Sequence, residues 1–238
     1  MHTITLFGGG PGFGLPEISP FATKTEIQLK MAGLVFSKER AQPSDSPKGQ
    51  LPFIKDGGAL IADSTFIRAH IEKTYGFDFD AGLDARQRAE AWAIERMIEN
   101  HFNFASGYTR FLLPENFAKG PAHWFDGAPE SMRDSLRQGL LDAVTATFKA
   151  TGIARHAPAE TVELGDRSLG ALSALMDDKP YLMSDQPAGV DAFAFASLAG
   201  ILTPFFDSPL RRRAESYPNL VAYTARMMAR YFPDHSWG

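Results

Sequence analysis

Residues 46–76 (SPKGQLPFIKDGGALIADSTFIRAHIEKTYG) constrain the fold of this chain more than any other segment. Two short apolar runs, 51–54 and 59–62, flank an Asp-Gly-Gly turn, and this pattern predicts a β-hairpin. An Asp-Ser pair follows at once and can cap the start of a helix. The segment therefore predicts a hairpin that leads directly into a helix, with a Leu-Pro pair where the first strand begins.

The ends of this hairpin present groups that suit a small zwitterionic peptide. The backbone of Leu51, beside Pro52, can pair with an extended peptide as an added strand. The Ser64 hydroxyl and the free N–H groups of the helix start can bind a carboxylate, and Asp63 can meet an ammonium group. Each residue alone could have a structural role, with Pro52 ending a loop and Asp63 or Ser64 capping the helix. Their order and spacing together favour a binding site.

The residues before the hairpin predict two strands separated by a helix. Residues 3–7 alternate threonine with apolar side chains, and 34–36 form a second apolar run, so both are expected to be strands. Between them, Ser19 followed by proline is a favoured helix start. An intervening helix makes the two strands parallel. The order strand, helix, strand, loop, hairpin, helix predicts a thioredoxin-like α/β domain over residues 1–76.

From residue 84 onward the sequence pattern is helical. An apolar stripe at helical spacing runs through 84–112. Further helices are expected over 131–151, 159–177, 189–202 and 219–231, and a loop rich in proline and glycine over 114–129. We therefore expect residues 77–83 to link the α/β domain to an all-α domain over 84–238.

The capped hairpin and the two-domain order resemble the glutathione transferase superfamily. In that superfamily the residue before a cis-proline pairs its backbone with the cysteinyl part of glutathione, and an acidic-Ser pair holds the γ-glutamyl end. The resemblance implies that Gln50, Leu51, Pro52, Asp63 and Ser64 bind glutathione, with a cis bond before the proline. It also implies glutathione as cosubstrate and a symmetric homodimer.

Four segments resemble one branch of this superfamily, the failed-axon-connections and metaxin-like branch: SPFATKTEIQLKMAGL, KGQLPFI, ADSTFI and PNLVAYTARMMARYFPD. Members of that branch commonly carry Cys where this chain has Ala22, so a thiol function is removed here. They also often place Thr or Ser three residues before the equivalent of Asp191, where this chain has Ala188. We expect the reciprocal helix cap at that position to be lost.

Ser19 is the candidate for activating the glutathione thiol, because in related classes this position holds a catalytic Ser or Cys. The thiolate is the nucleophile, and a free thiol with a pKa of about 8.5 is only a few per cent ionised at neutral pH. Lowering that pKa by ~2 requires roughly 2.7 kcal/mol. A hydroxyl bond to the charged sulfur contributes about 1.5–3 kcal/mol and a helix N-terminus about 0.3–1 kcal/mol. Ser19 could instead be only a helix cap, and both roles are compatible because capping uses an oxygen lone pair.

Aromatic residues are candidates for the pocket that receives an electrophile. His101, Phe104 and Tyr108 share one helical face, which in this fold borders the cleft. Phe13, within a glycine-rich loop, is a candidate lid residue, and Phe21 follows the predicted start of the first helix. The alternative is that the face 101–108 is an ordinary core stripe with a hydrogen-bonded histidine.

Composition excludes several other functions. The chain has no cysteine, so disulfides, thiolate metal sites and a cysteine nucleophile are excluded, and the six histidines show no metal-ligand spacing. We therefore expect no metal. A net charge of −4 gives no sign of a nucleic-acid surface, and no apolar run approaches the ~20 residues of a membrane span. The loop GGGPGFG does not match G-x-G-x-x-G in any register. A cytoplasmic location is expected.

Two functions remain from the sequence. The first is a glutathione-dependent transferase in which Ser19 activates the thiolate for attack on a small hydrophobic electrophile. The alternative is a non-catalytic module of the same fold that binds a protein partner. The sequence does not discriminate among conjugation, reduction, isomerisation and ether cleavage.

Overall fold

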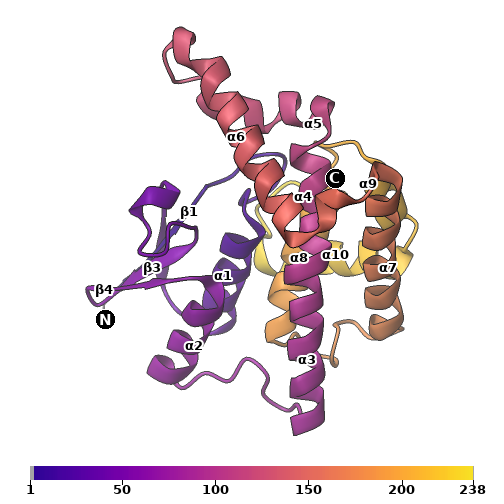
Figure 1. Ribbon diagram of the computed structural model, residues 1–238. Helices are drawn as coiled ribbons and strands as arrows, with labels where there is room; N and C mark the ends of the chain where they lie inside the picture. Colours follow the sequence, from indigo (N-terminus) through magenta and orange to yellow (C-terminus); the bar gives the residue numbers. More distant parts are fainter. Residues whose placement is uncertain (1–2, 238) are drawn as a thin grey trace.

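The computed structural model describes residues 3–237. Its N-terminal part is a four-stranded sheet in the order β2-β1-β3-β4, packed beside an all-helical part (Figure 1). The elements of the N-terminal part are β1 (Ile4–Gly8), α1 (Pro20–Met31), β2 (Phe36–Arg40), the 3₁₀ turn η1 (Pro43–Asp45), β3 (Phe53–Asp56), β4 (Ala59–Ala62) and α2 (Ser64–Tyr75). This is the thioredoxin-like order that the sequence predicted.

Helices α1 and α2 cover one face of the sheet. Alternate residues of the strands point toward that face, as the period of two in a strand requires. Ile4 and Leu6 of β1 and Ile54 of β3 are buried against Leu29 of α1 and Ile67 of α2. The apolar alternation in the sequence therefore specifies which face of the sheet the helices cover.

The second strand lies later in the chain than the sequence predicted. We expected it over 34–36, whereas β2 spans Phe36–Arg40 and pairs in parallel with β1. β2 is at the edge of the sheet, and its residues after Phe36 are exposed. An edge strand needs backbone partners on one side only, so its polar side chains do not prevent pairing.

The predicted hairpin is confirmed. β3 and β4 pair antiparallel, with Asp56 opposite Ala59. Gly57 and Gly58 between them have φ values of 55° and 95°. Two consecutive residues with positive φ are what the tightest hairpin turn requires, and glycine adopts this conformation without a steric penalty. The Asp-Gly-Gly signal therefore determines the turn locally.

The remaining chain is helical. Its elements are α3 (Ala85–Met97), the π-helical turn η2 (Ile98–Phe102), α4 (Asn103–Phe111), α5 (Pro114–Lys119), the 3₁₀ turn η3 (Pro121–Phe125), α6 (Glu130–Thr151), the 3₁₀ turn η4 (Ile153–Arg155), α7 (Pro158–Met176), α8 (Gly189–Leu202), α9 (Pro209–Glu215) and α10 (Pro218–Tyr231). The longer helices agree with the predicted ranges, but α5 lies within the expected loop. In residues 3–237 no helix is long and apolar enough to cross a membrane.

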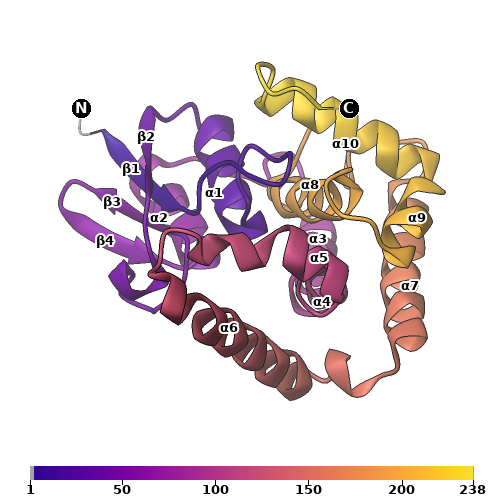
Figure 2. The same ribbon diagram turned by 90° about the horizontal axis from the view of Figure 1, so that it is seen from above.

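Helix α8 is the centre of the helical part. Almost all of its residues are buried, and it has no polar face. A helix that is apolar all round must be covered on all sides. Figure 2 shows α8 between α1 and α10, and α8 also contacts α3 and α9. Because α1 packs directly on α8, the start of α1 is held against the helical part.

Buried ion pairs join the two parts. Lys24 of α1 is fully buried, and its Nζ lies 2.8 Å from Oε1 of Glu95 in α3. Arg68 of α2 pairs with Asp80 at 2.6 Å, and the other carboxylate oxygen of Asp80 accepts the N–H of Gly189 at the start of α8. Separating either pair would leave a buried charge without its partner, which is costly, so these contacts favour one relative placement of the sheet and the helices.

Candidate active site

The start of α1 presents Ser19 as its N-cap. Ser19 Oγ accepts a hydrogen bond from the Ala22 N–H at a long distance of 3.4 Å, and Pro20 occupies the first helical position. The Ser19 carbonyl accepts bonds from the N–H and the hydroxyl of Thr23. Since capping uses only an oxygen lone pair of Ser19, its hydroxyl proton stays free to donate.

The mouth of the hairpin brings two predicted binding elements together. The Leu51–Pro52 bond is cis, as the resemblance predicted. Phe53 pairs with Ala62, and the Asp63 N–H donates to the Pro52 carbonyl at 3.3 Å. The backbone beside the proline and the start of α2 are therefore neighbours.

The start of α2 separates the roles of Asp63 and Ser64. Asp63 has φ 81° and ψ 126°, and its Oδ1 accepts the Thr65 N–H at 2.8 Å, so Asp63 is the helix cap. Ser64 is only 3% exposed, and no group in residues 3–237 forms a hydrogen bond with its hydroxyl. The unpaired hydroxyl oxygen is not fully enclosed, so a ligand carboxylate can reach it. Gln50 is exposed, next to the hairpin mouth.

Strand β1 links this mouth to Ser19. Phe7 pairs with Phe53, which places Gly8 at the end of β1 beside the mouth. A Cβ on Gly8 would lie 3.3 Å from the Cβ of Ala22 in the first turn of α1. The end of β1, the hairpin mouth and the start of α1 therefore converge at one end of the sheet. Ser19 lies at this end, together with the residues predicted to bind glutathione.

The sequence analysis missed Glu17. This carboxylate is 2% exposed and accepts the N–H groups of Gly9, Gly10 and Ser19 at 3.1, 2.9 and 3.1 Å. A Cβ on Gly8 would approach Glu17 to 2.8 Å, so the glycine-rich loop wraps closely around the carboxylate. Burial raises the pKa of Glu17, although the three N–H donors oppose that change. The signal was available, because Glu17 is the sole acidic residue in the first loop.

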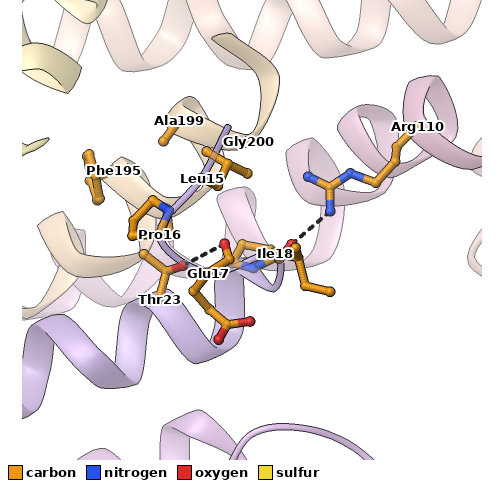
Figure 3. Close-up of a pocket in the computed structure, with 11 residues that line it drawn as sticks. Leu15, Pro16, Glu17, Ile18, Thr23, Arg110, Phe195, Ala199 and Gly200 are labelled. Carbon is orange, nitrogen blue, oxygen red and sulfur yellow. Dashed lines mark hydrogen bonds between the residues drawn. The ribbon is translucent and has the colours of Figure 1, made fainter. Parts of the chain in front are cut away.

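Arg110 of α4 was also missed. Its Nη1 donates to the Ile18 carbonyl at 2.9 Å, as Figure 3 shows. The guanidinium carbon lies 5.5 Å from each of the Phe13 and Phe206 ring centres. Burial lowers the pKa of Arg110 to about 10, and no carboxylate in residues 3–237 forms an ion pair with it. A cavity of about 10 Å³ beside Arg110, at the lower limit for one water, lies between the first loop and α8.

The five residues predicted to line the electrophile pocket lie in three places. Phe13 packs against Phe205, Phe206 and Trp124, with ring centres 5.2, 5.0 and 6.1 Å away. Phe21 packs against Phe193 with the two rings tilted by 38°, and Tyr108 is partly buried against the same helical core. His101 and Phe104 line a second cavity, described next. Only Phe13 is on the loop that leads to Ser19.

The second cavity, of about 110 Å³, lies within the helical part. Its lining residues come from η2, α4, α6, η4, α7 and the short connections on either side of η4: Asn100, His101, Phe104, Thr151, Gly152, Ile153, His156 and Leu164. His101 Nδ1 lies 3.0 Å from Ser168 Oγ, the partner that a core histidine requires. A shared helical face indicated burial for these residues, but it did not reveal that α6, η4 and α7 cover that face.

Asp191 retains half of the expected cap at the start of α8. Its Oδ2 accepts the Ala188 N–H at 2.8 Å, while Ala188 has no side-chain acceptor to return the bond. Oδ1 accepts the Leu182 N–H and the Tyr223 hydroxyl, each at 3.0 Å. Burial raises the pKa of Asp191 to about 6 despite these donors. The loss of the reciprocal cap agrees with the sequence prediction.

The fold and the site define a thioredoxin-fold protein with a helical second domain and a cis-proline hairpin beside two helix starts. Residues 20–116 match the family model described as glutathione S-transferase N-terminal domain, and 165–227 match the model described as glutathione S-transferase, C-terminal domain. The chain belongs to the glutathione S-transferase family.

Two curated relatives represent different proteins. Failed axon connections of Drosophila melanogaster is 33% identical over 236 residues, a match that covers 92% of this chain and 56% of the relative. The chain therefore spans little more than half of that protein. Isoprene-epoxide–glutathione S-transferase of Rhodococcus sp. (strain AD45) is 31% identical over 245 residues, covering 96% of this chain and 99% of the relative.

A solved structure shows the same fold. The β-etherase LigF from Sphingobium sp. strain SYK-6 superimposes with a TM-score of 0.65 and 18% identity, covering 98% of each chain. The predicted two-domain fold and the resemblance to the failed-axon-connections branch are thus confirmed.

Proposed function

We propose that this protein is a glutathione transferase in which Ser19 holds the glutathione thiolate for attack on a small hydrophobic electrophile. One observation carries the proposal: the Ser64 hydroxyl has no partner in residues 3–237, is not fully enclosed, and stands at a helix start next to the hairpin mouth. In this proposal Ser64 and the α2 N-terminus hold the γ-glutamyl carboxylate, and Asp63 faces the ammonium group. The Leu51 backbone pairs with the cysteinyl part, and Gln50 borders it.

The thiol then lies at the start of α1. There it loses its proton to water, and the Ser19 hydroxyl donates a hydrogen bond to the sulfur anion. That bond contributes about 1.5–3 kcal/mol and the α1 N-terminus about 0.3–1 kcal/mol. Together they are enough to lower the thiol pKa by ~2 without a metal or a histidine base.

We propose an epoxide as the electrophile, in line with the substrate named for the Rhodococcus relative. The thiolate sulfur forms a bond to an epoxide carbon while the bond from that carbon to oxygen breaks. The resulting alkoxide takes a proton from water and becomes a hydroxyl group. An apolar substrate would lie against Phe13 and Trp124, which pack together beside the first loop.

A binding module without catalysis is the second candidate. The apolar side chains of Leu60, Phe66 and Trp92 are 52%, 57% and 53% exposed, and they could contact a protein partner. We propose that Phe66 and Trp92 instead contact a second copy of the chain in a symmetric homodimer. We also propose a cytoplasmic location.

Retention on immobilised glutathione tests both candidates. A transferase should be retained, elute with free glutathione and show ultraviolet thiolate absorbance for the bound ligand near neutral pH. It should then consume glutathione with a small aliphatic epoxide. A protein that is not retained, or that is retained without forming thiolate, would contradict the transferase and fit the protein-binding module.

A further inference from the structure

The peptide between Ile18 and Ser19 is held from both sides by charged side chains. Its N–H, on Ser19, donates to Oε1 of Glu17 at 3.1 Å. Its carbonyl, on Ile18, accepts from Nη1 of Arg110 at 2.9 Å. In Figure 3 the guanidinium reaches the carbonyl from one side, while the Glu17 carboxylate points away from the arginine. A carboxylate and a guanidinium therefore bind opposite ends of a single peptide group.

Ion pairing does not explain why Glu17 and Arg110 are buried at the Ile18–Ser19 peptide. Charged side chains are rarely buried unless they are paired with each other. Arg110 has no carboxylate partner in the part of the chain that the structure describes. Glu17 is satisfied by three backbone N–H groups, and the cations facing its loop are Lys38 and Arg40 of β2. What Glu17 and Arg110 share is the peptide that precedes the side chain of Ser19.

We propose that Glu17 and Arg110 are positioning residues that aim the Ser19 hydroxyl at the glutathione thiol. This inference rests on the proposed function of Ser19. The peptide group is planar, so its orientation places the Ser19 Cα, and together with the Ser19 φ of −96° it sets the direction of the Cα–Cβ bond. A displacement of about 1 Å at a reacting group can cost on the order of 10²-fold in rate. Holding both ends of the peptide prevents such a displacement.

The arrangement also joins the thiol site to the helical domain. Arg110 is on α4, 92 residues after the carbonyl that it binds. The aromatic rings of Phe13 and Phe206 flank its guanidinium and keep water away from it. The orientation of Ser19 therefore depends on how the helical domain packs on the first loop.

A direct effect of the two charges on the thiolate is the competing explanation, and it predicts a different pattern. From the standard dimensions of a peptide, Glu17 Oε1 and Arg110 Nη1 each lie within about 6 Å of the Ser19 Cα. A negative charge at that distance raises the pKa of a thiol, and a positive charge lowers it. Removing Glu17 and removing Arg110 would then change the thiol pKa in opposite directions. Loss of positioning would instead raise the thiol pKa in both variants.

The experiment compares Glu17→Gln and Arg110→Met with the parent protein and with the control Arg86→Met, which removes an arginine that is 88% exposed on α3. Ultraviolet titration of bound glutathione gives the pKa of its thiol, and calorimetry gives the dissociation constant. Both test variants should raise the thiol pKa by about one pH unit. The dissociation constant should stay within about twofold of the parent, and the control should match the parent.

The same two substitutions in a Ser19→Ala protein separate positioning of the hydroxyl from a direct effect of the charges on the thiolate. In a Ser19→Ala protein, Glu17→Gln and Arg110→Met should produce no further change in the thiol pKa, because the hydroxyl they position is absent. A lower thiol pKa in Glu17→Gln, or an undiminished effect of Arg110→Met in the Ser19→Ala background, would overturn the proposal. If Glu17→Gln does not fold, as judged by circular dichroism, the Arg110→Met comparison alone decides.

The same measurements distinguish failure of this inference from failure of the proposed function. A parent protein that binds glutathione with a lowered thiol pKa, and variants that titrate like it, would leave the transferase assignment intact and refute the positioning role. A parent protein that shows no glutathione binding would refute both.

Discussion

Replacing Ser64 by alanine separates ligand binding from helix capping. Sequence reasoning allowed either Asp63 or Ser64 to cap α2, but the structure assigns the cap to Asp63, whose carboxylate accepts the Thr65 N–H at 2.8 Å. Ser64 is 3% exposed, and its hydroxyl has no partner in residues 3–237. Ser64→Ala should therefore remove a contact to the ligand without removing any contact within the protein.

The expected magnitude follows from the type of hydrogen bond lost. A hydroxyl bond to a carboxylate contributes about 1.5–3 kcal/mol, which is about a 10- to 160-fold weaker affinity for glutathione. The free energy of unfolding should change by no more than about 0.5 kcal/mol, since an unpaired hydroxyl contributes little to the folded state without ligand.

Calorimetric titration with glutathione and urea denaturation measure the two quantities independently. Asp63→Asn is the matched comparison: asparagine is an equally good cap and tolerates a positive φ, so stability should be kept. Loss of its exposed charge should weaken glutathione binding by only about 0.2–1 kcal/mol. If Ser64→Ala binds glutathione like the parent, or is destabilised by 1 kcal/mol or more, the assigned role of Ser64 is wrong.

Four further predictions follow from the other parts of the structure. Ser19→Ala should raise the pKa of the bound thiol by about 1–2 and slow turnover about 10- to 100-fold at neutral pH, and raising the pH should restore the rate. If the pH–rate profiles of variant and parent coincide, Ser19 is only a helix cap. Lys24→Met should lower the free energy of unfolding by about 1.5–3 kcal/mol, because Glu95 loses the charged hydrogen bond from Lys24 at 2.8 Å but keeps Arg96 at 2.7 Å. A cost under 1 kcal/mol in urea denaturation would contradict this. Asp191 has a folded pKa of about 6, above its unfolded value, so its contribution to stability is fully present below about pH 4 and is lost as the pH rises through 6. In Asp191→Asn, the free energy of unfolding should not show this decrease over the same pH range. If the variant and the parent show the same pH dependence of stability, the raised pKa is refuted. Light scattering at micromolar concentration should give the mass of two chains, and a monomer would rule out the proposed homodimer while leaving the thiol site as it stands.

The sequence by itself determined the elements whose signals are local. Turn glycines at 57 and 58, the Asp63 cap and the Ser19-Pro20 helix start each involve residues only a few positions apart. Local backbone preferences and capping bonds depend on such near neighbours, so they can be read without knowing the fold. The hairpin, the capped helices and most of the candidate glutathione site were therefore predictable.

The tertiary structure alone decided which distant side chains meet. Arg110 reaches the carbonyl of Ile18, and His101 faces Ser168 instead of the sheet. The helical pattern through 84–112 identified a buried face but could not say which element covers it, because burial depends on the amount of apolar surface and not on the identity of the partner. The burial of Glu17 was missed for the same reason. A carboxylate in a glycine-rich loop is expected to be exposed, and only the folded backbone supplies the three N–H donors that bind it.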